Sequence, residues 1–277
     1  MTSAGRPAPP TALTIAGSDS GGGAGLQADL RTFFACGVHA TTAVTLVTVQ
    51  DTVAVSDVVM IAPAMVAAQI ATVASDIGID AAKTGVLGTR EIIEAVAHAC
   101  DQAGVGRSRR TPFVVDPVAA SRDGRQLLDA AALDALRDQL FPLATVVTPN
   151  LDEVRLLTGV DVRHRDQLAE AARAVHAFGS EWTLIKSGHL THDSQCVDLL
   201  YDGSEFIELP GPRYATTDTH GAGDTMAAAL TASLARGTPV VEAVRFAKEF
   251  VSHAVRDAYP LGAGVGPVSP FWRVGAG

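Results

Sequence analysis

Residues 11–37, TALTIAGSDSGGGAGLQADLRTFFACG, pass from a strand pattern through a glycine-rich turn into a helical pattern. The apolar and β-branched run at 11–17 is typical of a buried strand, whereas residues 25–37 place apolar side chains at helical spacing. A strand joined to a helix by a short turn is the repeating unit of a parallel sheet that helices cover. This stretch therefore predicts an α/β protein.

The same handover from strand to helix recurs four times further along the chain. The predicted strand and helix segments are residues 39–50 and 62–76, 78–85 and 90–104, 111–118 and 127–140, and 144–150 and 152–159. A sixth strand is expected at 181–188, and two alternating runs at 194–211 predict an antiparallel hairpin. A helical pattern returns at 239–258, and the glycine-rich segment 262–270 is expected to be a surface loop. We predict one doubly wound, mostly parallel sheet.

Length and composition favour one globular domain over residues 11–277, after a flexible tail over residues 1–10. Hydrophobic residues make up 47% of the 277 residues and charged residues 18%, which is enough apolar material for a core and too little charge for disorder. The net charge of -9 argues against nucleic-acid binding, for which a basic surface is typical.

Two uncharged stretches, residues 32–50 and 58–75, reach the length of a membrane span. The first contains a glycine, a histidine and several threonines, and the second contains a proline and a glutamine, so we expect buried elements of a non-membrane protein. Three widely spaced cysteines favour neither a disulfide framework nor a zinc site. The expected location is the cytoplasm.

Polar residues gather directly after the predicted strands. In open α/β sheets, ligands bind beyond the carboxyl ends of the strands, so these residues are the first candidates for a site. Asp116 and Glu153 are suited to Mg²⁺, which takes one or two protein carboxylates together with phosphate oxygens. Lys186 is one of only three lysines among 21 basic residues, and a compact ammonium at a strand end suits a phosphate. A surface salt bridge is the alternative for Lys186.

The stretch TDTHGAGDTMAAAL at residues 217–230 places glycines and an aspartate in front of an apolar helical run. The backbone N–H groups of Gly221, Ala222 and Gly223 at the start of that helix predict an anion hole. Asp224 in the first turn is a candidate general base for an alcohol. Its alternative role is to stabilise the helix start, which contributes about 0.3–1 kcal/mol. The chain contains neither a P-loop motif nor a nucleophile elbow.

Seven segments together resemble a known family. In order they read LTIAGSDSGGGAGLQADLRTF, VTVQDT, KTGVLG, VVDPV, TPNLDE, IKSGHL and DTHGAGDT, between residues 13 and 225. The chain closely resembles the hydroxymethylpyrimidine and hydroxymethylpyrimidine-phosphate kinases of thiamine biosynthesis, which belong to the ribokinase-like superfamily. The first and last segments are specific to vitamin kinases of this group, whereas the DPV and GAGD segments also occur in sugar and pyridoxal kinases.

The resemblance implies a three-layer α/β/α fold with a small antiparallel hairpin, a homodimer, ATP as phosphoryl donor and Mg²⁺ as metal, and it leaves K⁺ open as a further cofactor. It implies substrate binding by Gly17, Asp29, Gln50 and Val86. ATP would be bound by Lys186, Asn150, His220 and Gly223. Mg²⁺ would be held by Asp116 and Glu153, and Asp224 would be the base beside an anion hole formed by Gly221, Ala222 and Gly223. From the sequence alone, Asp29 is equally suited to a helix start, and Gln50 to a strand end in water.

Two departures from the family pattern affect the substrate assignment. Many members carry cysteine where this chain has Asp224, and aspartate at that place is typical of sugar and pyridoxal kinases. After the DPV segment this chain reads AASRDG at residues 119–124, so Arg122 stands where a flap lysine is common. A carboxylate base assists phosphorylation of an alcohol but repels an acceptor that already carries phosphate. The alternatives are a pyridoxal kinase and a non-catalytic vitamin-binding protein on the same fold.

Overall fold

The computed structural model describes residues 8–107, 111–120, 126–188, 190 and 194–275. Within these residues, nine strands form one sheet in the order β3-β2-β1-β4-β5-β6-β7-β8-β9. The parallel strands are β1 (Thr11–Ser18), β2 (His39–Gln50), β4 (Ala81–Thr84), β5 (Phe113–Val115), β6 (Val146–Val147) and β7 (Trp182–Ile185). The strands β3 (Val55–Met60), β8 (Gln195–Tyr201) and β9 (Phe206–Pro212) are antiparallel to their neighbours. The predicted mostly parallel sheet is confirmed.

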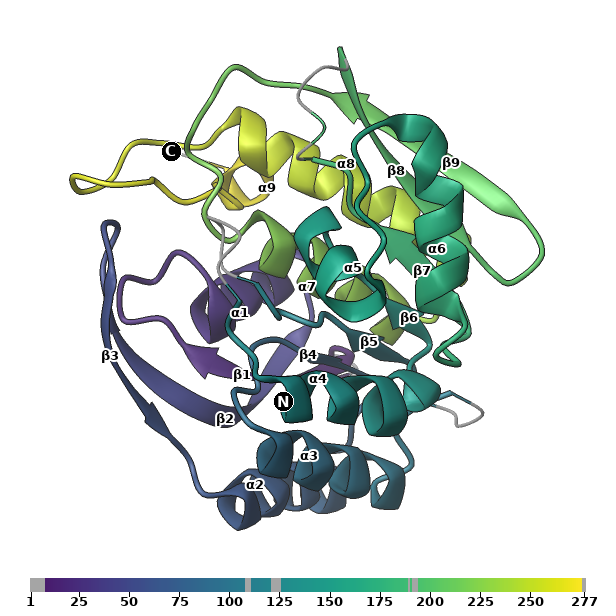
Figure 1. Cartoon of the computed structure of the whole chain (residues 1–277). Helices are drawn as coiled ribbons and strands as arrows, with labels where there is room; N and C mark the ends of the chain where they lie inside the picture. Colours follow the sequence, from purple (N-terminus) through teal and green to yellow (C-terminus); the bar gives the residue numbers. More distant parts are fainter. Residues whose placement is uncertain (1–7, 108–110, 121–125, 189, 191–193, 276–277) are drawn as a thin grey trace, which may run out of the picture.

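The order of the strands reverses at β1, which pairs with β2 on one side and with β4 on the other. The chain therefore winds from β1 in one direction and returns to continue in the other. Connections leave opposite faces of the sheet at such a point, which opens a crevice beyond the carboxyl ends of the strands. The fold thus places the predicted polar strand ends along one edge (Figure 1).

Helices cover both faces of the sheet and make the three predicted layers (Figure 1). One face carries α2 (Pro63–Asp76), α3 (Arg90–Gln102), α4 (Ala130–Ala135), α5 (Leu151–Thr158) and α6 (Leu168–His176). The other face carries α1 (Gly25–Ala35), α7 (Ala222–Ala235) and α8 (Val240–Arg256), with the short α9 (Phe271–Val274) beside them. Short turns of 3₁₀ helix lie at Phe141–Leu143 and Arg165–Gln167.

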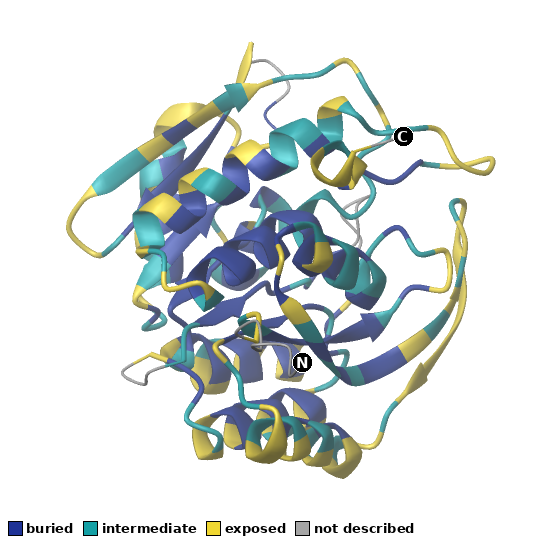
Figure 2. Ribbon diagram, turned by 180° about the vertical axis from the view of Figure 1, so that it is seen from behind, coloured by how far each residue is buried: buried dark blue, intermediate teal, exposed yellow. Residues whose placement is uncertain are grey.

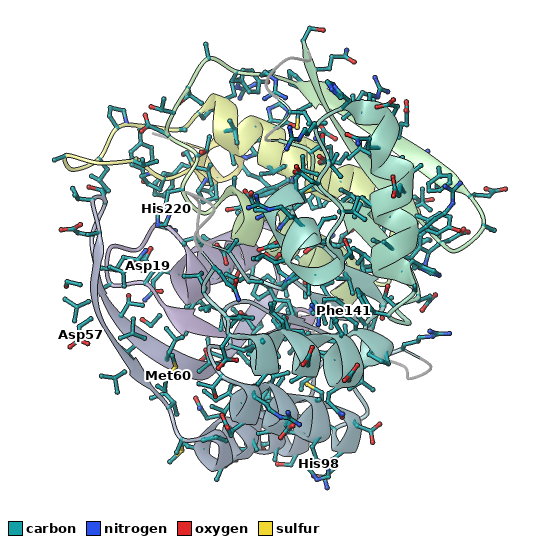
Figure 3. All side chains as sticks on the ribbon, viewed as in Figure 1. Asp19, Asp57, Met60, His98, Phe141 and His220 are labelled. Carbon is teal, nitrogen blue, oxygen red and sulfur yellow. The ribbon has the colours of Figure 1, made fainter. Side chains whose placement is uncertain are left out.

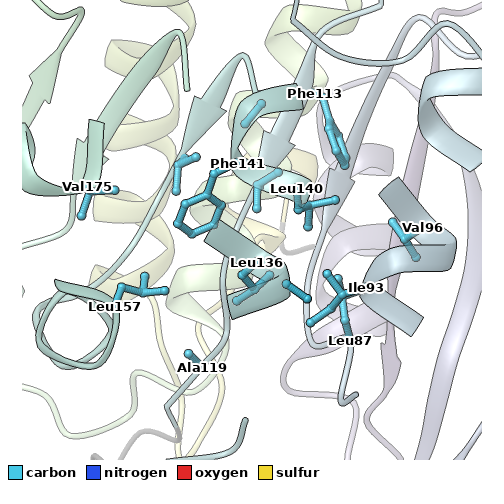
Figure 4. Packing of buried hydrophobic residues seen from close by; sticks show 14 of the residues in the cluster. Leu87, Ile93, Val96, Phe113, Ala119, Leu136, Leu140, Phe141, Leu157 and Val175 are labelled. Atoms are coloured by element: carbon cyan, nitrogen blue, oxygen red, sulfur yellow. The ribbon is translucent and has the colours of Figure 1, made fainter. Parts of the chain in front are cut away.

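Each face of the sheet has its own apolar core. Figure 4 shows the first, in which Phe113 of β5 and Phe141 are fully buried among leucines and valines of the covering helices. The second centres on α7, where every residue from Thr225 to Leu234 is buried. A helix that is buried on all sides needs small apolar residues, which explains the alanine-rich sequence after Asp224.

Five local features differ from the predictions. The elements β3, α6 and α9 were not expected. The helix predicted at 127–140 begins only at Ala130, where the Asp129 side chain caps it, and continues as a π-helical turn over Leu136–Leu140. The segment predicted as a surface loop is exposed at residues 262–264 but buried at 266–270. The boundary between tail and domain at residue 10 stays a prediction, and residues 1–7 lie outside the described part.

No helix among the described residues is long and apolar enough to cross a membrane. The two uncharged stretches instead form the end of α1 with β2, and the end of β3 with α2.

The burial of the cysteines predicts a chemical behaviour that can be measured. Burial raises the pKa of Cys36 to about 11 and the pKa of Cys100 to about 12. A thiol with a raised pKa is neutral at pH 8 and reacts slowly, because the thiolate is the nucleophile. We expect a thiol reagent at pH 8 to modify Cys36 and Cys100 only after denaturant is added, as followed by peptide mass spectrometry. Rapid modification of either cysteine in the native protein would contradict this burial.

Candidate active site

The start of α7 lies against the glycine-rich turn that follows β1. Gly221, the N-cap of α7, has a φ of 77°, and a side chain there would collide with the carbonyl oxygen of Gly23. A side chain on Gly23 would in turn collide with the ring of His220. At Gly221 the two backbones approach so closely that glycine is required, whereas at Gly23 the space for a side chain is filled by the His220 ring. The start of α7, with the unpaired N–H groups that any helix start carries, therefore lies against the turn after β1.

Asp19 organises the turn after β1, and no role was predicted for it. Its Oδ1 accepts a hydrogen bond from the backbone of Gly21 at 2.8 Å, and its Oδ2 accepts from Gly23 at 2.9 Å and Ala24 at 2.8 Å. His220 Nε2 lies 3.1 Å from Asp19 Oδ2, and Figure 3 shows the two side chains together. An aspartate followed by glycines is a signal for this kind of turn, but its link to His220 depends on the fold.

Asp224 lies in the first turn of α7, and its side chain is 19% exposed. Its Oδ1 is 3.9 Å from the Nζ of the fully buried Lys83, which lies on β4. A side chain on Gly85 would approach both groups to 3.8 Å, so the bare backbone after β4 lies next to them. The structure thus brings the predicted base to the strand edge, beside an ammonium group that was not assigned to the site.

Lys186 and Asp116 form an ion pair next to the start of α7. Lys186 Nζ donates to Asp116 Oδ1 at 2.8 Å, and Thr148 Oγ1 donates to the same oxygen at 3.2 Å. A side chain on Gly223 would lie 3.3 Å from Lys186 Nζ and 3.8 Å from Asp116 Oδ2. Burial alone would lower the pKa of Lys186, but the charges of Asp116 and Glu153 raise it. An anion above Gly223 would therefore meet a charged ammonium.

Glu153 and Asn150 form a capping box at the start of α5. Glu153 Oε2 accepts from the backbone of Asn150 at 2.8 Å, and Asn150 Oδ1 accepts from the backbone of Glu153 at 2.9 Å. Burial raises the pKa of Glu153 to about 7, against the opposing charge of Lys186. The predicted metal role of Glu153 and the predicted ATP role of Asn150 stay predictions, and both side chains also hold the helix start.

Three residues predicted to bind substrate lie at the ends of β1 and β2 and directly after β4. A side chain on Gly17 would collide with Leu46 at 2.5 Å and with Val86 at 2.7 Å. Gln50, at the end of β2, has its Nε2 3.4 Å from His220 Nε2. Gly17 therefore packs against β2 and the segment after β4, and Gln50 lies beside His220; their contacts with a substrate, and that of Val86, stay predictions.

Asp29 is fully buried, and both of its carboxylate oxygens have partners within the protein. Thr14 Oγ1 donates to Oδ2 at 2.6 Å, and Lys83 Nζ donates to Oδ1 at 2.7 Å. Burial raises the pKa of Asp29 to about 6, although the charge of Lys83 lowers it. Recognition of a substrate by Asp29 stays a prediction. In the structure, the carboxylate of Asp29 contacts Thr14 and Lys83.

Residues 264–266 form a C-terminal strap that joins the turn after β2 to the loop before His220. Thr52, in the turn after β2, accepts hydrogen bonds from the backbone of Gly264 at 3.1 Å and Val265 at 3.0 Å. The next residue, Gly266, donates to Asp218 Oδ1 at 2.8 Å. The strap thus ties the end of β2 to the loop before His220, which explains the burial of residues 266–270.

The segment after Asp116 is conformationally strained. Val118 has a φ of 40°, a value seen at no other non-glycine residue in the described ranges. A β-branched residue rarely adopts this conformation, and such strain is common at functional sites. The predicted flap residue Arg122 falls outside the described residues.

Comparisons with known proteins agree on one family. The profile of the phosphomethylpyrimidine kinase family matches residues 19–269. A hydroxymethylpyrimidine/phosphomethylpyrimidine kinase of Mycobacterium leprae is 52% identical over 96% of this chain and 98% of its own.

Two solved structures share the fold. The ADP complex of Bacillus subtilis pyridoxal kinase is 39% identical, with a TM-score of 0.87 over 97% of this chain and 100% of that one. The Staphylococcus aureus pyridoxal kinase in complex with AMP-PCP and pyridoxal is 37% identical, with a TM-score of 0.85 over 95% of this chain and 94% of that one. The ribokinase-like fold is confirmed, and the chain belongs to the phosphomethylpyrimidine kinase family.

Proposed function

We propose that this protein is an ATP-dependent kinase of thiamine biosynthesis that phosphorylates 4-amino-5-hydroxymethyl-2-methylpyrimidine and then its monophosphate. The observation that carries the proposal is the convergence of three elements at one sheet edge. The helix start at Gly221 offers N–H groups to an anion, Asp224 lies in its first turn, and the pair of Lys186 and Asp116 lies against Gly223. Phosphoryl transfer needs this combination of positioning and charge stabilisation.

The proposed first reaction uses Asp224 as the general base. The acceptor hydroxyl gives its proton to the Asp224 carboxylate while its oxygen forms a bond to the γ-phosphorus. The bond between that phosphorus and the oxygen retained by ADP breaks on the opposite side. The N–H group of Gly223 and the ammonium of Lys186 stabilise the charge on the transferred group. The N–H group of Ala222 already donates to the carbonyl oxygen of Thr219 at 3.2 Å. In the second reaction a phosphate oxygen attacks, and it needs no base at neutral pH.

Asp116 and Glu153 have the donor chemistry for Mg²⁺. Asp116 Oδ2 points toward Gly223, where the phosphates of ATP are proposed to lie. Glu153 is also buried, and its charge interacts with the charges of Asp116 and Lys186. The described residues contain no group of three metal-binding side chains, which suits an ion that takes its other ligands from phosphates and water. When bound, Mg²⁺ supplies neutralisation of phosphate charge.

A second candidate function is phosphorylation of pyridoxal. It is favoured by Asp224 and by the similarity to the two pyridoxal kinase structures. A non-catalytic vitamin-binding protein is disfavoured, because such a protein has no use for Asp116, Lys186 and Asp224 around one anion site.

A direct assay distinguishes these candidates. Purified protein with ATP and Mg²⁺ is offered hydroxymethylpyrimidine, its monophosphate and pyridoxal in parallel, and ADP release and product mass are measured. We expect turnover of both pyrimidines at a higher kcat/KM than that of pyridoxal. Preference for pyridoxal would replace the proposed substrate, and binding without any turnover would favour the vitamin-binding protein.

Replacement of Asp224 by asparagine separates the two phosphorylation steps. Because a positioned base contributes about 10²- to 10⁴-fold, Asp224→Asn is expected to lower kcat for the hydroxymethyl acceptor by that amount. The monophosphate needs no base, so its turnover is expected to change less than about tenfold on the same grounds. Steady-state ADP release with each acceptor measures both effects. Asp152→Asn, in the first turn of α5, is the matched control, and full activity of Asp224→Asn on the alcohol would exclude the base role.

We further propose a cytoplasmic homodimer that packs through the β2–β3 hairpin. Every residue of β3 is exposed, as Figure 2 shows, and Val47 of β2 lies opposite Val59 of β3 with exposed fractions of 45% and 62%. A second copy would cover these valines, which are unusual on the surface of a monomer.

Light scattering tests the dimer. We expect the wild-type protein to have about twice the 28.6 kDa mass of one chain, and Val59→Asp to shift it toward one chain because a charge would be buried at the interface. Val274→Asp, at an exposed valine of α9, is the control. A wild-type monomer at micromolar concentration would overturn the proposal.

A further inference from the structure

Lys83 is a fully buried ammonium group to which the proposed reaction assigns no role. Its neighbour across the parallel sheet is Thr14 of β1, and the two side chains lie on the face covered by α1 and α7. Thr14 and Lys83 both donate to Asp29 of α1, which is also fully buried. Asp29 thus balances the charge of Lys83 from one side.

The other side of Lys83 is turned toward Asp224. The Nζ group lies 3.9 Å from Asp224 Oδ1 on α7, and the glycine backbone at Gly85 leaves nothing bulky beside the pair. Burial alone would lower the pKa of Lys83, but the charges of Asp29, Asp224 and Asp116 raise it. Lys83 therefore stays an ammonium between a buried carboxylate and the carboxylate proposed as the base.

Stability alone does not account for this placement. Burying an ion pair costs about as much desolvation as the attraction returns, and two apolar side chains of similar volume are often as stable. Asp29 already balances the charge of Lys83. A purely structural ion pair would therefore not need to place the Lys83 ammonium next to Asp224. Buried charges whose pKa values are displaced by neighbours gather at functional sites.

We propose that Lys83 is a positioning residue that acts through Asp224. Its ammonium orients the Asp224 carboxylate toward the acceptor and offsets its negative charge when the acceptor carries a phosphate. Lys83 keeps its protons throughout, and the proton of the acceptor hydroxyl still goes to Asp224. This inference rests on the proposed function and extends it to the support of the base.

The test combines Lys83→Met with Asp224→Asn in a double-mutant cycle. We expect Lys83→Met to lower kcat for the hydroxymethyl acceptor at least about tenfold, as loss of orientation at a general base does. Because Lys83 would act through Asp224, its replacement in the Asp224→Asn background should lower the remaining rate less than about twofold, which is a non-additive result. The affinity for ADP, measured by calorimetry, should stay unchanged in all variants.

The KM values of the two acceptors give a second readout, because Lys83 would offset the negative charge of Asp224. Without Lys83, the carboxylate of Asp224 would repel a phosphate-bearing acceptor more strongly. We therefore expect Lys83→Met to raise KM for the monophosphate more than KM for the alcohol. A structural disturbance would raise both equally.

Two further variants separate a loss of function from a loss of folding. Lys83→Met leaves the Asp29 carboxylate buried without its partner, which by itself destabilises the fold; the double variant Asp29→Asn/Lys83→Met removes both charges and is expected to fold. Lys248→Met is the matched control, because Lys248 Nζ donates to Asp198 Oδ2 at 2.7 Å in a second buried pair. It should lower the melting temperature without changing the KM ratio of the two acceptors.

Equal losses on Lys83→Met in both backgrounds, or an unchanged kcat, would overturn the inference. Failure of the proposed function looks different, because wild-type protein would then not turn over the pyrimidines. If pyridoxal is the substrate instead, the same cycle is measured with pyridoxal and decides the role of Lys83.

Discussion

The close contact between the turn after β1 and the start of α7 sets the geometry of the whole site. Residues about two hundred positions apart meet backbone to backbone, at Gly23 and Gly221, and Asp19 and His220 join the same two segments through their side chains. A side chain at Gly221 would push the start of α7 away from the turn after β1, and a side chain at Gly23 would displace the His220 ring. Since phosphoryl transfer depends on holding two reactants within bonding distance, this contact determines whether the other groups can act together.

Around this contact, charges of opposite sign alternate. Asp29 faces Lys83, Lys83 faces Asp224, and on the other side of α7 Lys186 faces Asp116. Each lysine therefore lies between carboxylates, which keeps both ammonium groups charged despite their burial. Such a cluster contributes little to stability. Its physical effect is to fix the orientation of carboxylates and cations before any ligand arrives, so that little reorganisation is needed during the reaction.

The sequence predicted those features that depend only on residues close together in the chain. Glycines before α7 and a carboxylate in its first turn indicate an anion site because any helix start has unpaired N–H groups, and strand-to-helix handovers predicted the layers. β3 was missed because its valines are exposed in the single chain rather than packed in its core, so their pattern carries no signal for a buried strand. Lys83 and Asp19 were not assigned because their partners come from distant elements. Burial of Asp29 was equally invisible, since a helical aspartate is normally exposed.

The two proposed acceptors place opposite demands on one site. An alcohol needs a base, and an aspartate supplies one; a phosphomonoester brings its own charge, and the same aspartate repels it. Two unit charges about 4 Å apart interact by roughly 4 kcal/mol near a protein surface, whether they attract or repel. An ammonium at 3.9 Å from Asp224 therefore acts on the carboxylate with a strength comparable to the repulsion it opposes. This chain keeps the base and places a buried cation behind it.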